Sequence, residues 1–297
     1  MLLQQRVAIV TGAGGGLGRA HALYLAGKGA RVVVNDLSAE AAARVADEIA
    51  AAGGEALAWA GSVTDEAAVE AMVADAMARW NRVDILVNNA GILRDRSFAK
   101  MTIDDFRLVV DVHLIGAAIC SKAVWEPMRA ARYGRIVMTT SSSGLYGNFG
   151  QANYGAAKMA LVGLMQTLAI EGERYGIRVN CLAPTAATGM TQGVLPDGSL
   201  QLLAPDLVSP GLLALVGEDA PTRAILCAGA GHFAAAHVTL TTGLQVGNGP
   251  DAGERVVAGW PTVTDRAGEI VPAYGFVQAE REVAAAGLAT GAAAAAH

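Results

Sequence analysis

Short apolar runs alternate along this chain with longer segments that have helical periodicity. Most of the runs are rich in Val, Ile and Leu, and each ends close to Gly, Asn, Asp, Ser or Pro; they occupy residues 6–10, 31–35, 55–59, 84–88, 135–140 and 178–183. Runs of this length read as buried strands, and the segments between them are long enough for helices. The pattern predicts an α/β fold with a single doubly wound parallel sheet (Rossmann-like) and helices on both faces. Ligands of such folds bind beyond the carboxyl ends of the strands.

Capping residues set where several helices are expected to begin. Ser38 precedes a helix, Thr64 is the expected cap of a helix over about residues 65–80, and Thr102 with Asp105 resembles a capping box. The helix after Thr102 is expected to reach about Met128. A short helix over about residues 279–286, or short strands, is expected near the carboxyl end.

The first strand leads into a glycine-rich turn, T-G-A-G-G-G-L-G, at residues 11–18, and a helical segment follows at once. Such a turn places backbone N–H groups at a helix N-terminus with no side chains in the way, which suits a pyrophosphate. Because the spacing departs from G-x-G-x-x-G, the turn alone is weak evidence for a nucleotide site. The strand before it and the helix after it strengthen this interpretation. The candidate phosphate-binding residues are Gly12, Gly16, Leu17 and Gly18.

The second strand ends in Asp36, eighteen residues after Gly18. A doubly wound fold places at this point the carboxylate that binds the adenosine ribose hydroxyls. Because a carboxylate would repel a 2′-phosphate, we expect NAD rather than NADP. The alternative is that Asp36 only starts the turn before the Ser38-capped helix.

The fifth strand delivers Ser141, and the following segment carries Tyr154 and Lys158. Four residues separate Tyr154 from Lys158, so on a helix both side chains project from one face. A nearby ammonium favours the phenolate, which a general base for an alcohol requires. A shift of about three pKa units needs about 4 kcal/mol, so we expect Ser141 or the cofactor to assist Lys158. Taken alone, Tyr-x-x-x-Lys is more often an ordinary surface pair.

Composition narrows the class of protein. The chain has 297 residues, is 53% hydrophobic, carries a formal charge of −5 and shows no basic cluster, so we expect no nucleic-acid partner. No apolar run reaches the roughly 18 residues that span a bilayer, so we expect no membrane partner. The three cysteines match neither a disulfide framework nor a metal spacing, so we expect no metal and a cytoplasmic location.

Together, T-G-x-x-x-G-x-G, the N-N-A-G stretch at residues 88–91, and Ser141 thirteen residues before Tyr-x-x-x-Lys resemble the short-chain dehydrogenase/reductase family over roughly residues 1–245. Further stretches, such as G-I-L-R-D-R-S-F at 91–98 and Y-G-N-F-G-Q-A-N-Y at 146–154, resemble the (3R)-hydroxyacyl-CoA dehydrogenase domains of type 2 peroxisomal multifunctional enzymes and their bacterial relatives.

The resemblance implies roles for individual residues. Tyr154 would take the hydroxyl proton, Ser141 would hold the developing carbonyl oxygen, and Lys158 would bond the nicotinamide ribose and lower the tyrosine pKa. Further cofactor contacts would come from Ser62 and Val63 beside adenine, from Asn89, Ala90 and Gly91, and from Pro184 to Thr188 around the nicotinamide amide.

Two positions depart from the family pattern. Ser62 stands where Asp is usual, and His113 stands at the fourth catalytic position, which is commonly Asn. A histidine in a long helix is more often a satisfied core residue than a proton relay, so a catalytic role for His113 is one of two alternatives.

The resemblance also implies an NAD-dependent oxidoreductase that interconverts a secondary alcohol and a ketone, with a (3R)-3-hydroxyacyl-CoA thioester as the expected substrate. A steroid or other secondary alcohol is the alternative substrate, and a non-catalytic dinucleotide-sensing or scaffold protein is the alternative class. We expect a homodimer or homotetramer, a substrate loop at about residues 189–215, and a carboxyl-terminal extension of unassigned role at 246–297.

Overall fold

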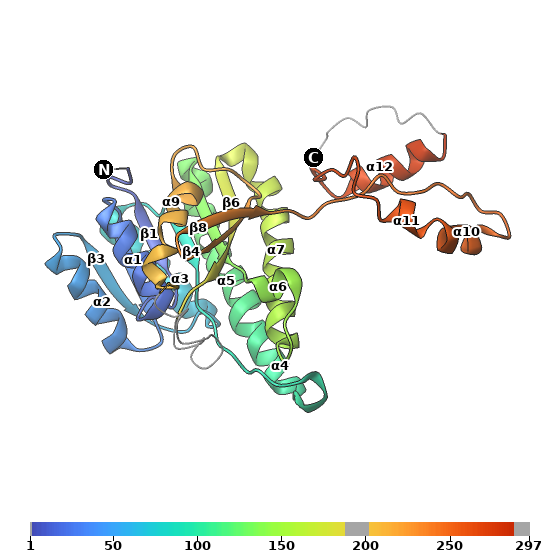
Figure 1. The fold of residues 1–297 in the computed structure, drawn as a ribbon. Coiled ribbons are helices and arrows are strands. Elements are labelled where there is room, and N and C mark those ends of the chain that lie inside the picture. The colour runs from blue at the N-terminus through green and yellow to red at the C-terminus, as the bar shows by residue number, and fades with distance from the viewer. Residues whose placement is uncertain (1, 188–201, 288–297) are drawn as a thin grey trace. The chain divides into compact units, whose positions relative to one another are not determined.

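An eight-stranded sheet forms the centre of the larger part of the chain (Figure 1). The structure is a computed structural model that describes residues 2–187 and 202–287. Its strand order is β3-β2-β1-β4-β5-β6-β7-β8, and every neighbouring pair is parallel except β7 and β8. The strands are β1 (Val7–Val10), β2 (Arg31–Asp36), β3 (Ala56–Ala60), β4 (Ile85–Asn88), β5 (Gly134–Thr139), β6 (Ile177–Thr185), β7 (Ile225–Gly229) and β8 (His232–Ala236). The predicted doubly wound α/β sheet is confirmed, and β7 and β8 extend it beyond the six predicted strands.

Helices cover both faces because side chains alternate along each strand. Val7 and Ile9 of β1 belong to one buried cluster, whereas Ala8 and Val10 belong to the other. The first cluster includes residues of α3 (Glu66–Trp80), α5 (Gly116–Ala131) and α7 (Ala152–Gly172), and the second includes residues of α1 (Gly16–Gly27), α2 (Ala39–Ala51) and α9 (Pro210–Val216). The parallel strands are therefore buried on both sides, which explains their nearly continuous apolar runs.

Two of the three expected helix caps are present. The Ser38 hydroxyl accepts from the Ala41 amide, and the Thr102 hydroxyl accepts from the Asp105 amide. At α3 the prediction was wrong: the cap is Asp65, whose carboxylate accepts from the Ala68 amide at 3.1 Å. The Thr64 hydroxyl is turned instead toward the Ser62 hydroxyl, 2.8 Å away.

The long helix expected after Thr102 contains a π-turn. It consists of α4 (Ile103–Val110), the π-turn η2 (Asp111–Ile115) and α5. By length and composition alone, the 29 residues Ile103–Ala131 could cross a membrane, which the apolar-run criterion did not anticipate. This is weak evidence for a membrane, because the helix packs within the α/β layers and buries side chains such as Val109, Cys120 and Val124.

The carboxyl-terminal part is a separate unit. The chain divides into Met1–Ala236 and His237–His297, so the boundary falls before the expected residue 245. The second unit contains α10 (Ala252–Ala258), α11 (Trp260–Val263), α12 (Phe276–Ala285) and a bridge between Leu240 and Ile270. None of its described residues is buried, so it has no hydrophobic core of its own within 237–287.

Candidate active site

The loops that leave the carboxyl ends of five strands surround one cavity of about 580 Å³. Asp36 ends β2, and Ser141 follows β5; β1 and β4 lie between these strands. At about 4.8 Å per strand, the two side chains mark opposite ends of a site roughly 14 Å across. The cavity is lined by Gly12, Gly15, Gly16, Leu17, Gly18, Asp36, Asn89, Ala90, Gly91, Leu93, His113, Thr139, Ser141, Ser142, Ser143, Asn148, Gln151, Tyr154, Lys158, Pro184, Thr185 and Ala186.

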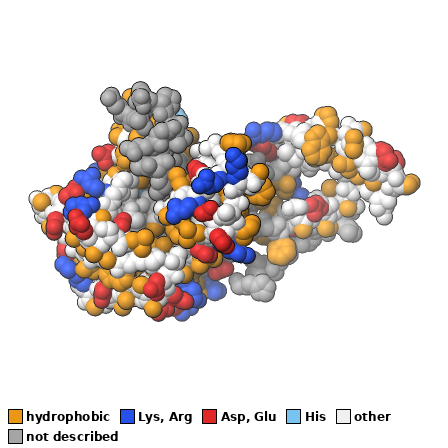
Figure 2. Space-filling model, turned by 90° about the horizontal axis from the view of Figure 1, so that it is seen from below, with side chains coloured by type: hydrophobic (Ala, Val, Ile, Leu, Met, Phe, Trp, Pro, Cys, Tyr) orange, Lys and Arg blue, Asp and Glu red, His pale blue; other side chains and the backbone are white. Residues whose placement is uncertain are grey.

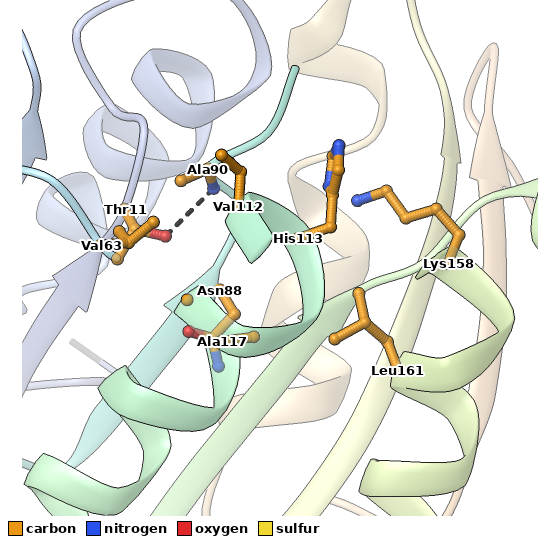
Figure 3. Close-up of a pocket in the computed structure, with 10 residues that line it drawn as sticks. Thr11, Val63, Asn88, Ala90, Val112, His113, Ala117, Lys158 and Leu161 are labelled. Carbon is orange, nitrogen blue, oxygen red and sulfur yellow. Dashed lines mark hydrogen bonds between the residues drawn. The ribbon is translucent and has the colours of Figure 1, made fainter. Parts of the chain in front are cut away.

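The glycine-rich turn is packed so closely at Gly12, Gly14 and Gly18 that a larger residue would not fit there. A Cβ atom on Gly18 would lie 2.1 Å from the Gly12 carbonyl oxygen. The Asn89 amide donates to the carbonyls of Thr11 and Gly12 at 3.0 and 3.1 Å, so Asn89 ties the loop after β4 to the loop after β1. The Thr11 hydroxyl accepts from the backbone amides of Asn89 and Ala90, and Figure 3 shows the bond from Ala90. These bonds hold the turn around the start of α1, where N–H groups without a side-chain cap suit a phosphate.

Asp36 has a backbone role as well as a place in the cavity wall. Its Oδ2 accepts from the Gly14 amide at 2.9 Å, and its Oδ1 accepts from the Ser38 amide at 3.1 Å. Both readings of this residue are therefore compatible with the structure: it orders the turn before α2, and it presents a carboxylate to the cavity. The orientation of that carboxylate is fixed from two sides.

Some of the expected cofactor residues lie away from the cavity lining. Val63 is buried and approaches Gly116, while Ser62 bonds Thr64, and neither is among the residues that line this cavity. Pro184 does line it, and Thr188 lies outside the described residues.

The carboxyl-side part of the expected substrate loop has a core role instead. None of the described residues 202–215 lines the cavity. Val208, which precedes α9, and Leu212 and Leu215, which lie in α9, are buried in the same cluster as residues of α1, so these apolar side chains serve the core.

Ser141 and Tyr154 meet at the β5 end of the cavity. Ser141 caps the short helix α6 (Ser142–Tyr146) by accepting from the Ser143 amide at 3.2 Å, and this fixes its hydroxyl. Burial raises the pKa of Tyr154 above its ordinary value, the hydrogen bond with Ser141 acts in the lowering direction, and the Asp95 charge raises it further. In this structure burial therefore outweighs the activation that the Tyr-x-x-x-Lys spacing predicts.

Lys158 lies one helical turn beyond Tyr154 and is buried, although it lines the cavity. Its Nζ donates to the Thr139 carbonyl at 2.5 Å and lies 5.5 Å from the centre of the Tyr154 ring. Burial lowers the pKa of Lys158 to about 7. Anionic groups that entered the cavity would favour the ammonium form, because an opposite charge compensates for lost hydration.

His113 lies in the π-turn η2 and joins it to the loop after β4. Its Nε2 is 2.8 Å from the Ile92 carbonyl oxygen and 3.1 Å from the Ile92 amide, and its ring meets the Tyr154 ring edge-on at 5.2 Å. Burial, reinforced by the Lys158 charge, lowers the pKa of His113 to about 3, so the imidazole is neutral. A Cβ atom on Gly91 would lie 2.1 Å from the ring, which explains the glycine. The expectation that His113 relays protons stays a prediction.

Lys158 and His113 also line a second, much smaller cavity of about 10 Å³ (Figure 3). The Lys158 ammonium points toward the His113 ring beside it. His113 Nδ1 and Asn88 Oδ1 are buried without hydrogen-bond partners among the described residues. A polar space of this size could accommodate one water molecule.

Sequence reasoning missed two residues that organise the site. Asn153 is fully buried; its amide donates to the Arg94 carbonyl at 3.0 Å, and its oxygen accepts from the Tyr154 amide at 2.7 Å. Gln151 donates to Asp95 at 2.6 Å and accepts from the Ser143 hydroxyl at 2.8 Å. The signal available in the sequence was the presence of two polar amide side chains within the three residues before Tyr154.

The fold and the site define a doubly wound α/β protein with a Ser, Tyr and Lys set and a glycine-rich turn around one cavity. Comparison with known proteins identifies its family, because the model of the family "short chain dehydrogenase" matches residues 6–197. The chain belongs to the short-chain dehydrogenase family.

Three similar proteins place the chain within this family. A peroxisomal hydratase-dehydrogenase-epimerase of Saccharomyces cerevisiae is 46% identical over 88% of this chain and 30% of its own length. The full-length peroxisomal multifunctional enzyme type 2 of Drosophila melanogaster is 40% identical with a TM-score of 0.79, over 94% of this chain and 49% of that chain. A 7α-hydroxysteroid dehydrogenase, solved with NADH and 7-oxo glycochenodeoxycholic acid, is 31% identical with a TM-score of 0.71, over 77% of this chain and 94% of that chain. The chain thus spans less than half of the two multifunctional relatives.

Proposed function

We propose that this protein is an NAD-dependent dehydrogenase that interconverts a (3R)-3-hydroxyacyl-CoA thioester and its 3-ketoacyl thioester. The observation that carries the proposal is the gathering of Ser141, Tyr154 and Lys158 at one end of a cavity whose other end holds Asp36 and the glycine turn. The similarity to multifunctional peroxisomal enzymes supports the thioester. The presence of NADH in the related steroid dehydrogenase, together with Asp36, supports NAD.

The residues present fit such a cofactor. Gly15 lines the cavity, and a Cβ atom there would meet nothing within 4 Å, so the missing side chain leaves open space beside the start of α1, which offers N–H groups to a pyrophosphate. Asp36 would hold the adenosine ribose, and Lys158 would hold the nicotinamide ribose. When bound, NAD accepts the hydride from the substrate carbon.

The proton moves through residues of this chain. In the oxidation direction the Tyr154 phenolate takes the proton of the substrate hydroxyl, and the Ser141 hydroxyl donates to the oxygen as it becomes a carbonyl. Burial makes the phenolate costly, so the charge on Lys158 has to be maintained for activity. Reduction reverses these steps, with Tyr154 as the proton donor.

The test is the formation of reduced nicotinamide with a panel of 3-hydroxyacyl-CoA thioesters, comparing wild type with Tyr154→Phe. Loss of the general base should lower kcat by about 10²- to 10⁴-fold. Tyr146→Phe is a matched control, because this tyrosine is 72% exposed and does not line the cavity. Equal rates for wild type and Tyr154→Phe would contradict the mechanism, and no turnover of any thioester would contradict the substrate.

A steroid is the second candidate substrate. It is favoured by the likeness to the 7α-hydroxysteroid dehydrogenase over 77% of this chain. The same assay separates the two candidates when steroid alcohols are added to the panel.

We also propose that the protein forms a homo-oligomer through the surfaces of η2 and α7. Ile115 in η2 and Met159 and Ile170 in α7 are 44%, 40% and 45% exposed, so both elements present apolar surface that a second copy could cover. Light scattering coupled to size exclusion tests this, and a monomer at micromolar concentration would contradict it.

A further inference from the structure

A surface segment next to the Tyr154 end of the cavity has no role in the mechanism above. It comprises residues 94–100, here called the rim segment, and it follows Leu93, which lines the cavity. Its last three residues form the turn η1 (Phe98–Lys100), which projects beside α4 in Figure 1. All but Ser97 are exposed.

Three hydrogen bonds fix the rim segment to the residues around the start of α7. The Asn153 amide donates to the Arg94 carbonyl at 3.0 Å, the Gln151 amide donates to Asp95 at 2.6 Å, and the Arg96 amide donates to the Gly150 carbonyl at 2.9 Å. These partners directly precede Tyr154 in the chain. These hydrogen bonds therefore fix the rim segment in place at the edge of the site.

Along this edge the carboxylates have hydrogen-bond partners, whereas two of the cations have none among the described residues. Asp95 is bonded by Gln151, and nearby Asp105 is bonded by the Thr102 hydroxyl at 2.9 Å. Within the part of the chain that the structure describes, neither the Arg96 guanidinium nor the Lys100 ammonium has an ion pair or a side-chain hydrogen bond. Two available cations beside the cavity contrast with the net charge of −5 of the whole chain.

An aromatic ring lies between these cations in the sequence. Phe98 is 75% exposed, so it makes little use of its apolar surface within the chain. Figure 2, which shows the face seen from below Figure 1, has Lys and Arg side chains interspersed with Asp, Glu and hydrophobic side chains near its middle. Guanidinium and ammonium groups bind phosphates, and an exposed aromatic face can stack on a base.

We propose that the rim segment binds the nucleotide part of a coenzyme A thioester, with Arg96 and Lys100 on its phosphates and Phe98 against its adenine. The inference rests on the proposed function for its choice of a thioester. The dinucleotide would occupy the end with the glycine turn and Asp36, so the long non-reacting arm of the substrate has to leave at the opposite end. That end is bordered by Leu93, Asn148 and Gln151, next to the rim segment.

The experiment compares two substrates that share one acyl group. Oxidation of (3R)-3-hydroxybutyryl-CoA is measured beside oxidation of the N-acetylcysteamine thioester, which has the reacting atoms but no nucleotide. The variants are Arg96→Glu, Lys100→Glu and Phe98→Ala. Arg44→Glu is the control for charge reversal, since Arg44 is exposed on α2 and does not line the cavity.

For Arg96→Glu and Lys100→Glu we expect kcat/KM to fall about tenfold with the CoA thioester and less than about twofold with the short thioester. The difference should shrink as salt is raised, because exposed charges are screened. Phe98→Ala should show a smaller loss with the same selectivity. Equal losses with both thioesters, or none with either, would overturn the inference while leaving the dehydrogenase function intact.

Calorimetric binding of free coenzyme A provides a readout that needs no turnover. Arg96→Glu should weaken this binding about tenfold relative to Arg44→Glu. If wild type oxidises no thioester but binds coenzyme A through Arg96, the proposed dehydrogenase function fails, whereas the inference that the rim segment binds the nucleotide is supported. Binding that is absent in wild type, or unchanged in Arg96→Glu, overturns the inference.

Discussion

A methyl group added at position 91 tests how His113 is held. The Cβ atom of Gly91→Ala would lie 2.1 Å from His113 Cε1 and 2.8 Å from Nδ1. The ring cannot turn away freely, because Nε2 is bonded to Ile92 and the ring edge meets Tyr154. Relief therefore requires loss of that hydrogen bond or displacement of the loop.

The size of the effect follows from these contacts. Overpacking of a buried site costs about 1–3 kcal/mol, and a lost hydrogen bond costs about 0.5–1.5 kcal/mol. We expect Gly91→Ala to lower the free energy of unfolding by about 2–3 kcal/mol. It should also lower kcat, because the displaced ring moves the phenol that it touches. In a His113→Ala background the ring is absent, so the same methyl group should cost little.

The assay is a double-mutant cycle by urea denaturation of the wild type, both single variants and the double variant. A coupling energy of about 1–2 kcal/mol is expected for residues in such contact. Gly27→Ala is the control, since a Cβ atom there meets nothing within 4 Å. Additive losses in Gly91→Ala and His113→Ala would refute the reasoning.

Two further predictions concern cofactor choice and acid stability. Asp36→Ser should shift the ratio of kcat/KM values from NAD toward NADP by about tenfold or more, because a fixed carboxylate no longer faces the 2′-phosphate; an unchanged ratio in steady-state kinetics would show that Asp36 does not select the cofactor. His21 is fully buried with its Nδ1 2.9 Å from the Ser209 hydroxyl, and burial lowers its pKa to about 3. The folded pKa is below the unfolded value, so the unfolded state binds the proton first and stability is lost as pH falls from about 6.5 toward 3, by up to about 1.4 kcal/mol per pH unit. Urea denaturation between pH 4 and 7 should give a shallower slope for His21→Gln than for wild type, and parallel slopes would contradict this assignment.

The outline of the fold could be predicted from the sequence because the strands are buried on both sides and read as apolar runs. The caps at Ser38 and Thr102 could also be predicted, since capping is a local interaction. The cap at α3 could not be predicted, because Thr64 and Asp65 are both good caps and the Ser62 hydroxyl decides between them. The antiparallel strand β8 was missed because it is short and largely exposed, with little apolar pattern.

By itself, the sequence determined which groups meet at the cavity, because the glycine turn, Asp36 and Ser141 each follow a predicted parallel strand and the carboxyl ends of such strands share one edge of the sheet. Only the tertiary structure decided the electrostatic state of these groups. Burial lowers the pKa of Lys158 to about 7, raises the pKa of Tyr154 and leaves His113 uncharged, and burial depends on neighbours far away in the chain. For the same reason the rim segment emerged only from the structure: its bonds to Gly150, Gln151 and Asn153 join residues more than fifty positions apart.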